Sequence, residues 1–326
     1  MYNIVNGYGA AVLSAIYSKI PTFGKIFVVC ASTDPNFGKL REVFRDDPEG
    51  QVMIYNDVNT AYGATVDGRN DIVALTGNAS HTVTAMMDVT KSRVHFVGIN
   101  PGDRGYGQAA KIVMGVTTAA TDLGAMKNTG VRNSFINIKF DSGNTKAESL
   151  YTVVEAGEYA YYENCEFYKS TDLDETGAAE LLLNGDSAQF KNCTIGSSAN
   201  EIVGAVIRPC VLVTATISGK KCRDASFVDC KLMRKCGNVA NRFVYGANAT
   251  DVERLLEFKN CLFYNSKLAS ADPAQAIAFG ATQTGGDVVV YGTSAGVNVT
   301  KISTTTGVTV VGPAINSGAF IGVNAA

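Results

Sequence analysis

Hydrophobic and polar positions recur in one order four times in the middle of the chain. Each repeat has an aromatic residue, a variable residue, Asn or Asp, then Cys, and an apolar side chain two residues later. The repeats occupy 162–167, 190–195, 227–232 and 258–263, and a fifth, FINIKF at 135–140, has Ile138 in place of Cys. The positions of this Ile and the four Cys lie 27, 28, 37 and 31 residues apart, which is typical of stacked solenoid repeats.

In each repeat the Asn or Asp stands between two sets of apolar residues, and these two sets would lie on opposite faces of one continuous strand. In a flat strand the aromatic residue and the Cys would point to opposite faces. A bend at the Asn turns both inward, and Asn tolerates the left-handed backbone conformation that such a bend needs. Two short strands that meet at an Asn corner make one coil of a parallel β-helix. The sequence therefore predicts an all-β fold, a single-stranded right-handed parallel β-helix (solenoid) with N-terminal capping helices.

Equivalent residues of successive coils should form ladders about 4.8 Å apart. Amides in the corner ladder can pass hydrogen bonds from coil to coil, and an Asp there can accept from neighbouring amides. The Cys side chains would lie slightly too far apart for a relaxed disulfide, so we expect free thiols. Glu163 and Lys191 should form an outward-facing charge pair of small energy. The predicted structural ladder is Asn137, Asn164, Asn192, Asp229 and Asn260, with Cys165, Cys193, Cys230 and Cys261 beside it.

Upstream of the repeats the pattern predicts a helix and then further coils. Val58, Ala61, Tyr62 and Thr65 recur with a helical period on one face, with a start at Asn56 or Asp57 and a stop at Gly68. A strand over 72–75 follows, and Val94, Phe96 and Gly98 share one parity in the next. We expect the helix to close the open end of the solenoid.

The chain divides into three predicted parts. Residues 1–50 form an N-terminal arm and capping helix, in which Asp34 is the N-cap and Pro35 the first helical residue. The apolar face of this helix packs either on the solenoid or on a neighbouring subunit. Residues 51–265 form the β-helix, and 266–326 form C-terminal strands that are last coils or a subunit-contact segment.

Composition narrows the classes of function. The 326 residues carry 28 basic and 30 acidic side chains, and no basic stretch is interleaved with aromatic residues, which argues against nucleic acid as a partner. The N-terminus has neither a signal-peptide pattern nor an apolar run long enough to span a membrane, so we expect a soluble protein without membrane contact. The eight Cys lack zinc-site spacing and fit folding in a reducing cytoplasm; we expect no metal and no cofactor.

The segment from Leu40 to Ile112 carries a resemblance. The order of VNTAYGAT, GRNDIVALTGN, HTVT and VHFVGIN resembles the first coils of pectate-lyase-like β-helix proteins. More narrowly, the stretch from LREVF to HTVT is similar to proteins encoded beside the major capsid gene of tailed bacteriophages. This resemblance implies a head decoration protein on the capsid exterior, with the major capsid protein as its partner. The coil repeats support only the broader class, because such repeats occur with unrelated functions.

Catalysis on this scaffold would need acids on the outer face of the coils. Two carboxylates one coil apart would match the separation of about 5 Å in retaining glycosidases. The candidates are Asp172, Asp174 and Asp103. Asp172 and Asp174 lie in a polar break between coils, and no second acid recurs at the matching position. Asp174 and Glu175 could instead bind calcium, although no acidic loop repeats to support this.

Three further features have a structural and a functional interpretation. Asp103 and Arg104 lie in a glycine-rich loop that is either a turn or part of a polysaccharide cleft. His81 and His95 have no evident nucleophile partner, so a catalytic triad is unsupported. The densest basic patch is either a solvated face or a contact to an acidic capsid surface. It comprises Lys220, Lys221, Arg223, Lys231, Arg234 and Lys235.

The leading hypothesis is a non-enzymatic structural virion protein, a homotrimer that decorates or cements the phage head. One alternative is a tailspike, polysaccharide lyase or glycosidase on the same scaffold. The other is a module that binds surface glycans without cleaving them.

Overall fold

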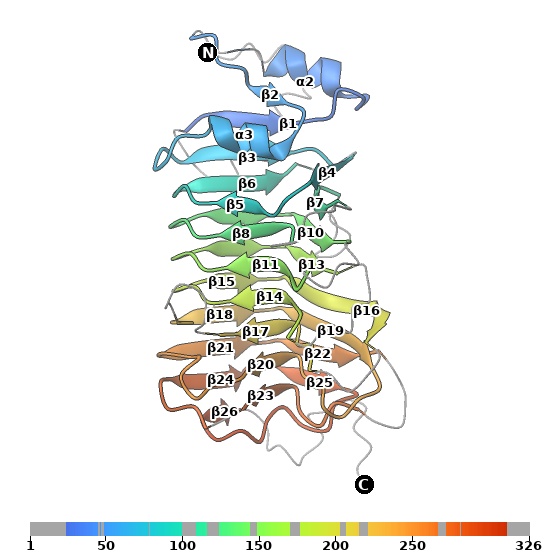
Figure 1. Cartoon of the computed structure of the whole chain (residues 1–326), viewed down its shortest axis with the longest axis vertical. Helices are drawn as coiled ribbons and strands as arrows, with labels where there is room; N and C mark the ends of the chain where they lie inside the picture. Colours follow the sequence, from blue (N-terminus) through green and yellow to red (C-terminus); the bar gives the residue numbers. More distant parts are fainter. Residues whose placement is uncertain are drawn as a thin grey trace.

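The computed structural model describes residues 24–44, 46, 49–77, 79–99, 109–115, 124–143, 149–169, 177–202, 207–214, 221–266, 272–280 and 282–311. These residues wind into a rod of stacked coils built from three parallel sheets (Figure 1). The predicted fold class, a right-handed parallel β-helix, is confirmed. No helix in this part of the chain is long and apolar enough to cross a membrane.

Each full coil contributes one strand to each sheet, in the order A, B, C. Over the described residues, sheet A contains β2 (Ile54–Tyr55), β1 (Ile26–Val29), β3 (Asp71–Leu75), β6 (Val94–Gly98), β9 (Ser134–Ile136), β12 (Tyr161–Glu163), β15 (Gln189–Lys191), β18 (Ala225–Val228), β21 (Leu255–Lys259), β24 (Asp287–Tyr291) and β26 (Val308–Val310). Sheet B contains β4 (Ser80–Val83), β7 (Lys111–Met114), β10 (Lys139–Ser142), β13 (Glu166–Tyr168), β16 (Thr194–Ile202), β19 (Lys231–Cys236), β22 (Leu262–Asn265) and β25 (Ala295–Val297). Sheet C contains β5 (Met87–Val89), β8 (Met126–Asn128), β11 (Tyr151–Glu155), β14 (Ala179–Leu183), β17 (Val211–Val213), β20 (Val244–Gly246) and β23 (Ile277–Phe279).

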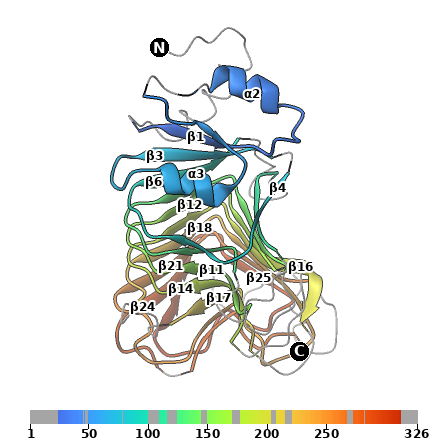
Figure 2. The ribbon, with the colours of Figure 1, turned by 45° about the horizontal axis from the view of Figure 1, so that its top comes forward.

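The three sheets enclose one apolar interior, and the coils follow one another along it (Figure 2). The interior is ordered by register, because parallel pairing places the same position of each repeat next to its equivalent in the following coil. Successive ring centroids lie 5.2, 4.7, 4.8, 4.5 and 4.9 Å apart in one stack. The stack consists of Phe96, Phe135, Tyr162, Phe190, Phe227 and Phe258, all fully buried. The apolar residue that follows each Cys or Ile by two positions is also buried: Phe140, Phe167, Ile195, Leu232 and Phe263.

The helix α3 (Val58–Ala64) packs against the first coils. The carboxylate of Asp57 accepts a hydrogen bond from the Thr60 N–H at 2.8 Å, so Asp57 is the N-cap. The helix ends at Ala64, and the prediction of a stop at Gly68 is wrong by four residues. Its end is set by Lys91, whose Nζ donates to the carbonyls of Tyr62, Gly63 and Thr65 at 3.0, 2.9 and 2.7 Å.

The outermost N-terminal part consists of β1, β2 and α2 (Phe37–Val43), which lie beyond β3 in Figure 1. The predicted N-cap of α2 is wrong. Asn36 precedes the helix, while Asp34 accepts from the Asn36 N–H at 2.8 Å and so stabilises the turn before it. At the other end of the rod, β23, β24, β25 and β26 extend all three sheets beyond residue 266.

Candidate functional site

Asp103, Asp172 and Asp174 lie outside the described residues, as do Arg104 and Glu175. The remaining candidates lie on the outer faces and at the corners of the described coils.

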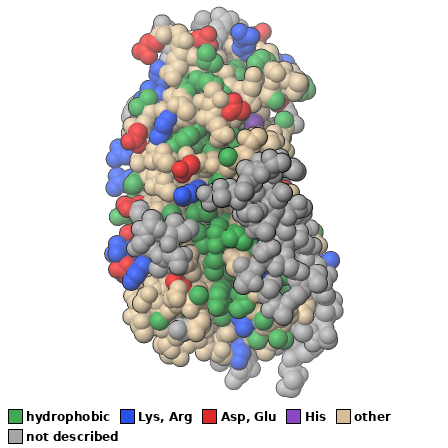
Figure 3. Space-filling model, viewed as in Figure 1, with side chains coloured by type: hydrophobic (Ala, Val, Ile, Leu, Met, Phe, Trp, Pro, Cys, Tyr) green, Lys and Arg blue, Asp and Glu red, His purple; other side chains and the backbone are tan. Residues whose placement is uncertain are grey.

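The outer face of sheet C carries hydrocarbon in its central coils. Val154 and Leu182 are paired in adjacent strands and point away from the core, yet they are only 3% and 1% exposed. They form a second apolar cluster with Ala156, against which Met86, Tyr151 and Leu212 pack. Hydrophobic side chains form a band over this region in Figure 3. The register continues the outward column as Asp88, Lys127, Val154, Leu182, Leu212, Tyr245 and Ala278. This column, as far as the structure describes it, has no two carboxylates in adjacent coils.

The outer face of sheet B carries a half-buried polar cluster. The ammonium of Lys139 lies 3.3 Å from Glu166 Oε1 in the next coil and 3.8 Å from the ring centroid of Tyr168. Glu166 is 8% exposed, and its other oxygen, Oε2, has no hydrogen-bond partner in the described part of the chain. This oxygen is itself buried, so a ligand hydroxyl could reach it only if neighbouring side chains moved. Sequence reasoning did not single out Glu166, because one acid beside a Cys has no distinguishing pattern.

A buried polar network lies inside the coils. Glu155 is fully buried and accepts hydrogen bonds from the Tyr162 hydroxyl at 2.5 Å, the Gly157 N–H at 2.7 Å and the Asn128 amide at 2.9 Å. Burial first, and the adjacent Glu155 second, raise the pKa of Tyr162 well above its usual value. A network so fully hydrogen-bonded and closed to solvent stabilises the interior rather than meeting a substrate.

The predicted basic patch is not one surface. Arg234 lies inside, 4% exposed, and its two terminal nitrogens each donate to a different oxygen of Glu180 at 2.6 Å. Arg223 lies at a corner that precedes sheet A, whereas Lys231 and Lys235 belong to β19 of sheet B. The prediction of one basic patch is therefore wrong. Arg234 is buried, and the bend at Asp229 sends the segments before and after it to different faces. Lys220 lies outside the described residues.

A second column of left-handed residues joins sheet C to sheet A; we call it the C–A corner. Its backbone φ values range from 44° to 65° over six consecutive coils. The pairing of the strands that follow places these residues in one register. The members are Asn70, Arg93, Arg132, Tyr159, Ser187 and Asp224. Sequence reasoning missed this corner because its residues share no chemical type.

The predicted ladder lies at the A–B corner. Asn137, Asn164, Asn192, Asp229 and Asn260 have φ values from 51° to 58°, as the proposed bend requires. Asn164 donates to Asn137 at 3.1 Å, Asn192 to Asn164 at 2.6 Å, and Asn260 to Asp229 at 3.0 Å. These three amides each donate to the preceding coil, whereas Asp229 has no amide with which to donate to Asn192.

The thiols beside this ladder are buried and free. Each thiol donates to the carbonyl of the aromatic residue one coil earlier: Cys165 to Phe135, Cys193 to Tyr162, Cys230 to Phe190 and Cys261 to Phe227, at 3.2 to 3.6 Å. Burial raises the pKa of Cys193 and Cys230 well above the usual value, which suppresses the reactive thiolate.

Among the described residues, neither histidine is hydrogen-bonded to a hydroxyl or a thiol, although Ser134 is the register partner of His95 in the next coil. A ring nitrogen of His81 is 2.9 Å from the Thr76 carbonyl, and burial lowers the pKa of His81. Burial also lowers the pKa of His95 to about 4. In the described part of the chain, no group of three or more His, Cys, Asp or Glu side chains could hold a metal ion.

No family model matches the sequence, and no curated protein matches it at a significant level. Solved structures do share its architecture. The crystal structure of pectate lyase Pel9A is 14% identical with a TM-score of 0.53, and the match covers 90% of this chain and 69% of that one. This chain has a pectate-lyase-like β-helix fold. Pectin methylesterase PemA from Erwinia chrysanthemi is 10% identical with a TM-score of 0.52, covering 85% of this chain and 80% of that one. ORF18 of Geobacillus virus E2 is 13% identical with a TM-score of 0.40, covering 73% and 52%. At these identities the likeness is one of fold, and fold alone does not specify activity.

Proposed function

We propose that the chain is a non-enzymatic structural protein of a tailed-phage virion, which decorates or cements the capsid as a homotrimer. The observation that carries the proposal is the outer face of sheet C. Val154, Leu182 and Leu212 occupy successive coils of its outward column, and the described residues of this column place no two carboxylates in adjacent coils. Hydrocarbon at this place cannot transfer protons.

The interior supports a mechanical role. The aromatic stack runs through six coils without a break, and the corner amides are hydrogen-bonded along the same axis. Because each coil is held by its neighbours through backbone pairing and side-chain ladders, the rod resists local unfolding. A stiff rod suits a protein that bridges or braces a shell.

The sequence supports the location. The segment 40–112, which resembles proteins encoded beside the major capsid gene, contains α3, β3 and β6 and so lies near the N-terminal end of the rod. In this proposal that end and the outer faces meet the major capsid protein and sister chains, and the chain folds in the host cytoplasm before it joins the capsid exterior.

Purified virions test the proposal directly. We expect mass spectrometry to detect the protein in high copy number and cryo-electron microscopy to show it as trimeric density on the shell. Light scattering on the isolated protein should give three times the mass of 34.4 kDa. A few copies at the tail, or none in the virion, would rule out decoration.

The Lys139–Glu166–Tyr168 cluster favours an enzyme as a second candidate, because Glu166 combines burial with an unpartnered oxygen. The test is release of oligosaccharides from host capsular polysaccharide and from polygalacturonate. Turnover by the native protein that Glu166→Gln, Asp172→Asn or Asp103→Asn abolishes would establish a lyase or glycosidase. Binding of a glycan without turnover would instead identify a glycan-binding module.

A further inference from the structure

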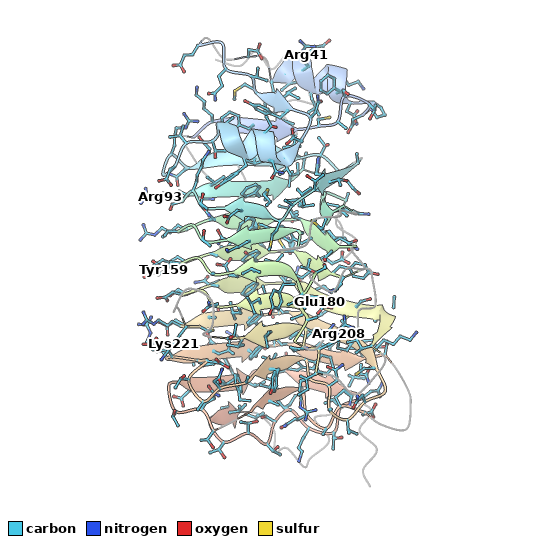
Figure 4. All side chains as sticks on the ribbon, viewed as in Figure 1. Arg41, Arg93, Tyr159, Glu180, Arg208 and Lys221 are labelled. Carbon is cyan, nitrogen blue, oxygen red and sulfur yellow. The ribbon has the colours of Figure 1, made fainter. Side chains whose placement is uncertain are left out.

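The first coils of the C–A corner present an exposed row of two arginines and a tyrosine. Arg93, Arg132 and Tyr159 occupy equivalent positions in three consecutive coils, because β6, β9 and β12 pair in register directly after them. All three are exposed, and Tyr159 is 53% exposed. Arg93 and Tyr159 project from the same edge of the rod in Figure 4.

Backbone geometry does not account for these residue types. Their φ values are 55°, 59° and 56°, a region in which bulky residues are uncommon and Asn or Gly is favoured. The A–B corner of the same rod has this conformation at five positions and fills each with Asn or Asp. Holding Arg and Tyr in this conformation costs on the order of 1 kcal/mol each, so their side chains require another explanation.

Charge pairing within the chain does not account for them either. Neither guanidinium has a carboxylate partner among the described residues, and the Arg132 guanidinium carbon lies 5.6 Å from the centre of the Tyr159 ring. Adjacent like charges on neighbouring coils repel one another. Later coils of the same corner are balanced: Arg223 binds Glu253 at 2.8 Å, and Arg254 binds Asp224 at 2.6 Å.

We propose that Arg93, Arg132 and Tyr159 form a recognition edge for an acidic protein surface. Arginine and tyrosine are the residue types that most often dominate the energy of protein interfaces. Two guanidinium groups without carboxylate partners require a negatively charged binding partner. A convex row along the rod axis fits a line of carboxylates better than a small ligand. The identification of that acidic surface as the capsid rests on the proposed function. The proposal that the edge binds an acidic protein surface does not.

A substitution that preserves the corner tests the edge. The triple variant R93N/R132N/Y159N removes both charges and the ring but keeps residues that tolerate left-handed φ, so it should fold with at least native thermal stability. The matched control K191N/K259N removes two exposed positive charges from sheet A, away from this edge. The probe is poly-L-glutamate, measured by biolayer interferometry at low salt.

We expect the native protein and the control to bind the probe, and the triple variant to bind at least about tenfold more weakly. Equal binding by the triple variant, or no binding by the native protein, would overturn the proposal. Polygalacturonate is measured in parallel. If it bound through this edge while poly-L-glutamate did not, the ligand would be an acidic glycan, and the protein-surface proposal would be wrong.

Capsid shells assembled from the major capsid protein of the same virus separate this proposal from the proposed function. Native protein that fails to sediment with shells but binds poly-L-glutamate through the edge would contradict only the capsid role. If the native protein and the triple variant sedimented equally with the shells, the capsid role would stand, but the edge would not be the surface that binds the capsid.

Discussion

The hydroxyl of Tyr162 donates a hydrogen bond to the carboxylate of Glu155 across 2.5 Å inside the solenoid. Tyr162 occupies a position that Phe fills in the neighbouring coils, and its ring stacks between Phe135 and Phe190 at 4.7 and 4.8 Å. The ring therefore belongs to the apolar stack, while the hydroxyl satisfies a carboxylate that has no access to water.

Tyr162→Phe should keep the ring stack and destabilise the fold. The change removes one donor from a fully buried carboxylate, which costs roughly 1–3 kcal/mol in the free energy of unfolding. Urea denaturation measures the effect, and Tyr161→Phe on the half-exposed outer side of the same strand is the control, with an expected change below about 0.5 kcal/mol. Equal midpoints for the native protein and Tyr162→Phe would show that Glu155 does not depend on this donor.

Asp229→Asn should stabilise the protein. An amide at this position still accepts from Asn260 and can also donate to Asn192, which the carboxylate cannot do. One added hydrogen bond contributes about 0.5–1.5 kcal/mol. The reciprocal variant Asn192→Asp breaks the ladder at a second coil and should lower the melting temperature. If both variants shifted it in the same direction, the ladder would not be the cause.

Cys193→Ser should destabilise the rod more than Glu163→Gln. Cys193 is 1% exposed, and a serine hydroxyl could donate to the same two carbonyls as the thiol. The more polar hydroxyl would nevertheless replace an apolar sulfur in a closed column, which lowers the free energy of unfolding by about 1–2 kcal/mol. Glu163 is 4.0 Å from the exposed ammonium of Lys191, so its loss should change stability by less than about 0.5 kcal/mol. Equal thermal shifts would contradict the assignment of these side chains to the inside and outside.

Stability should fall as the pH drops from about 6.5 to about 4, in part because of His95. Burial lowers the pKa of His95 to about 4, below the ordinary 6.5, so the unfolded chain binds more protons in this window and acid favours unfolding. One such group contributes at most about 1.4 kcal/mol per pH unit.

His95→Gln tests this contribution. Denaturation midpoints measured at several pH values should show a shallower decline for His95→Gln, while His81, whose pKa burial also lowers, keeps its own share of the slope. Identical slopes for the variant and the native protein would show that His95 does not titrate as a buried group.

The sequence by itself determined the A–B corner and the interior. The order of aromatic residue, Asn and Cys encodes the bend and the inward faces, since side-chain alternation and the left-handed tolerance of Asn are local properties. The fold class, the start of α3 at Asn56 or Asp57 and the buried apolar columns follow from such local rules, and the structure selects Asp57. The exact helix ends do not: Lys91, 27 residues after Ala64, terminates α3.

Only the tertiary structure decided which surface features come together. Arg93, Arg132 and Tyr159 share no type, yet coil register places them in one row. Lys139 meets Glu166 of the next coil, and Glu180 reaches Arg234 from a different sheet. The sequence-based prediction grouped Arg234 with its basic neighbours because these residues are close together along the chain. In the solenoid, proximity is set by the stacking of coils about thirty residues apart, so surface chemistry depends on a register that no short motif records.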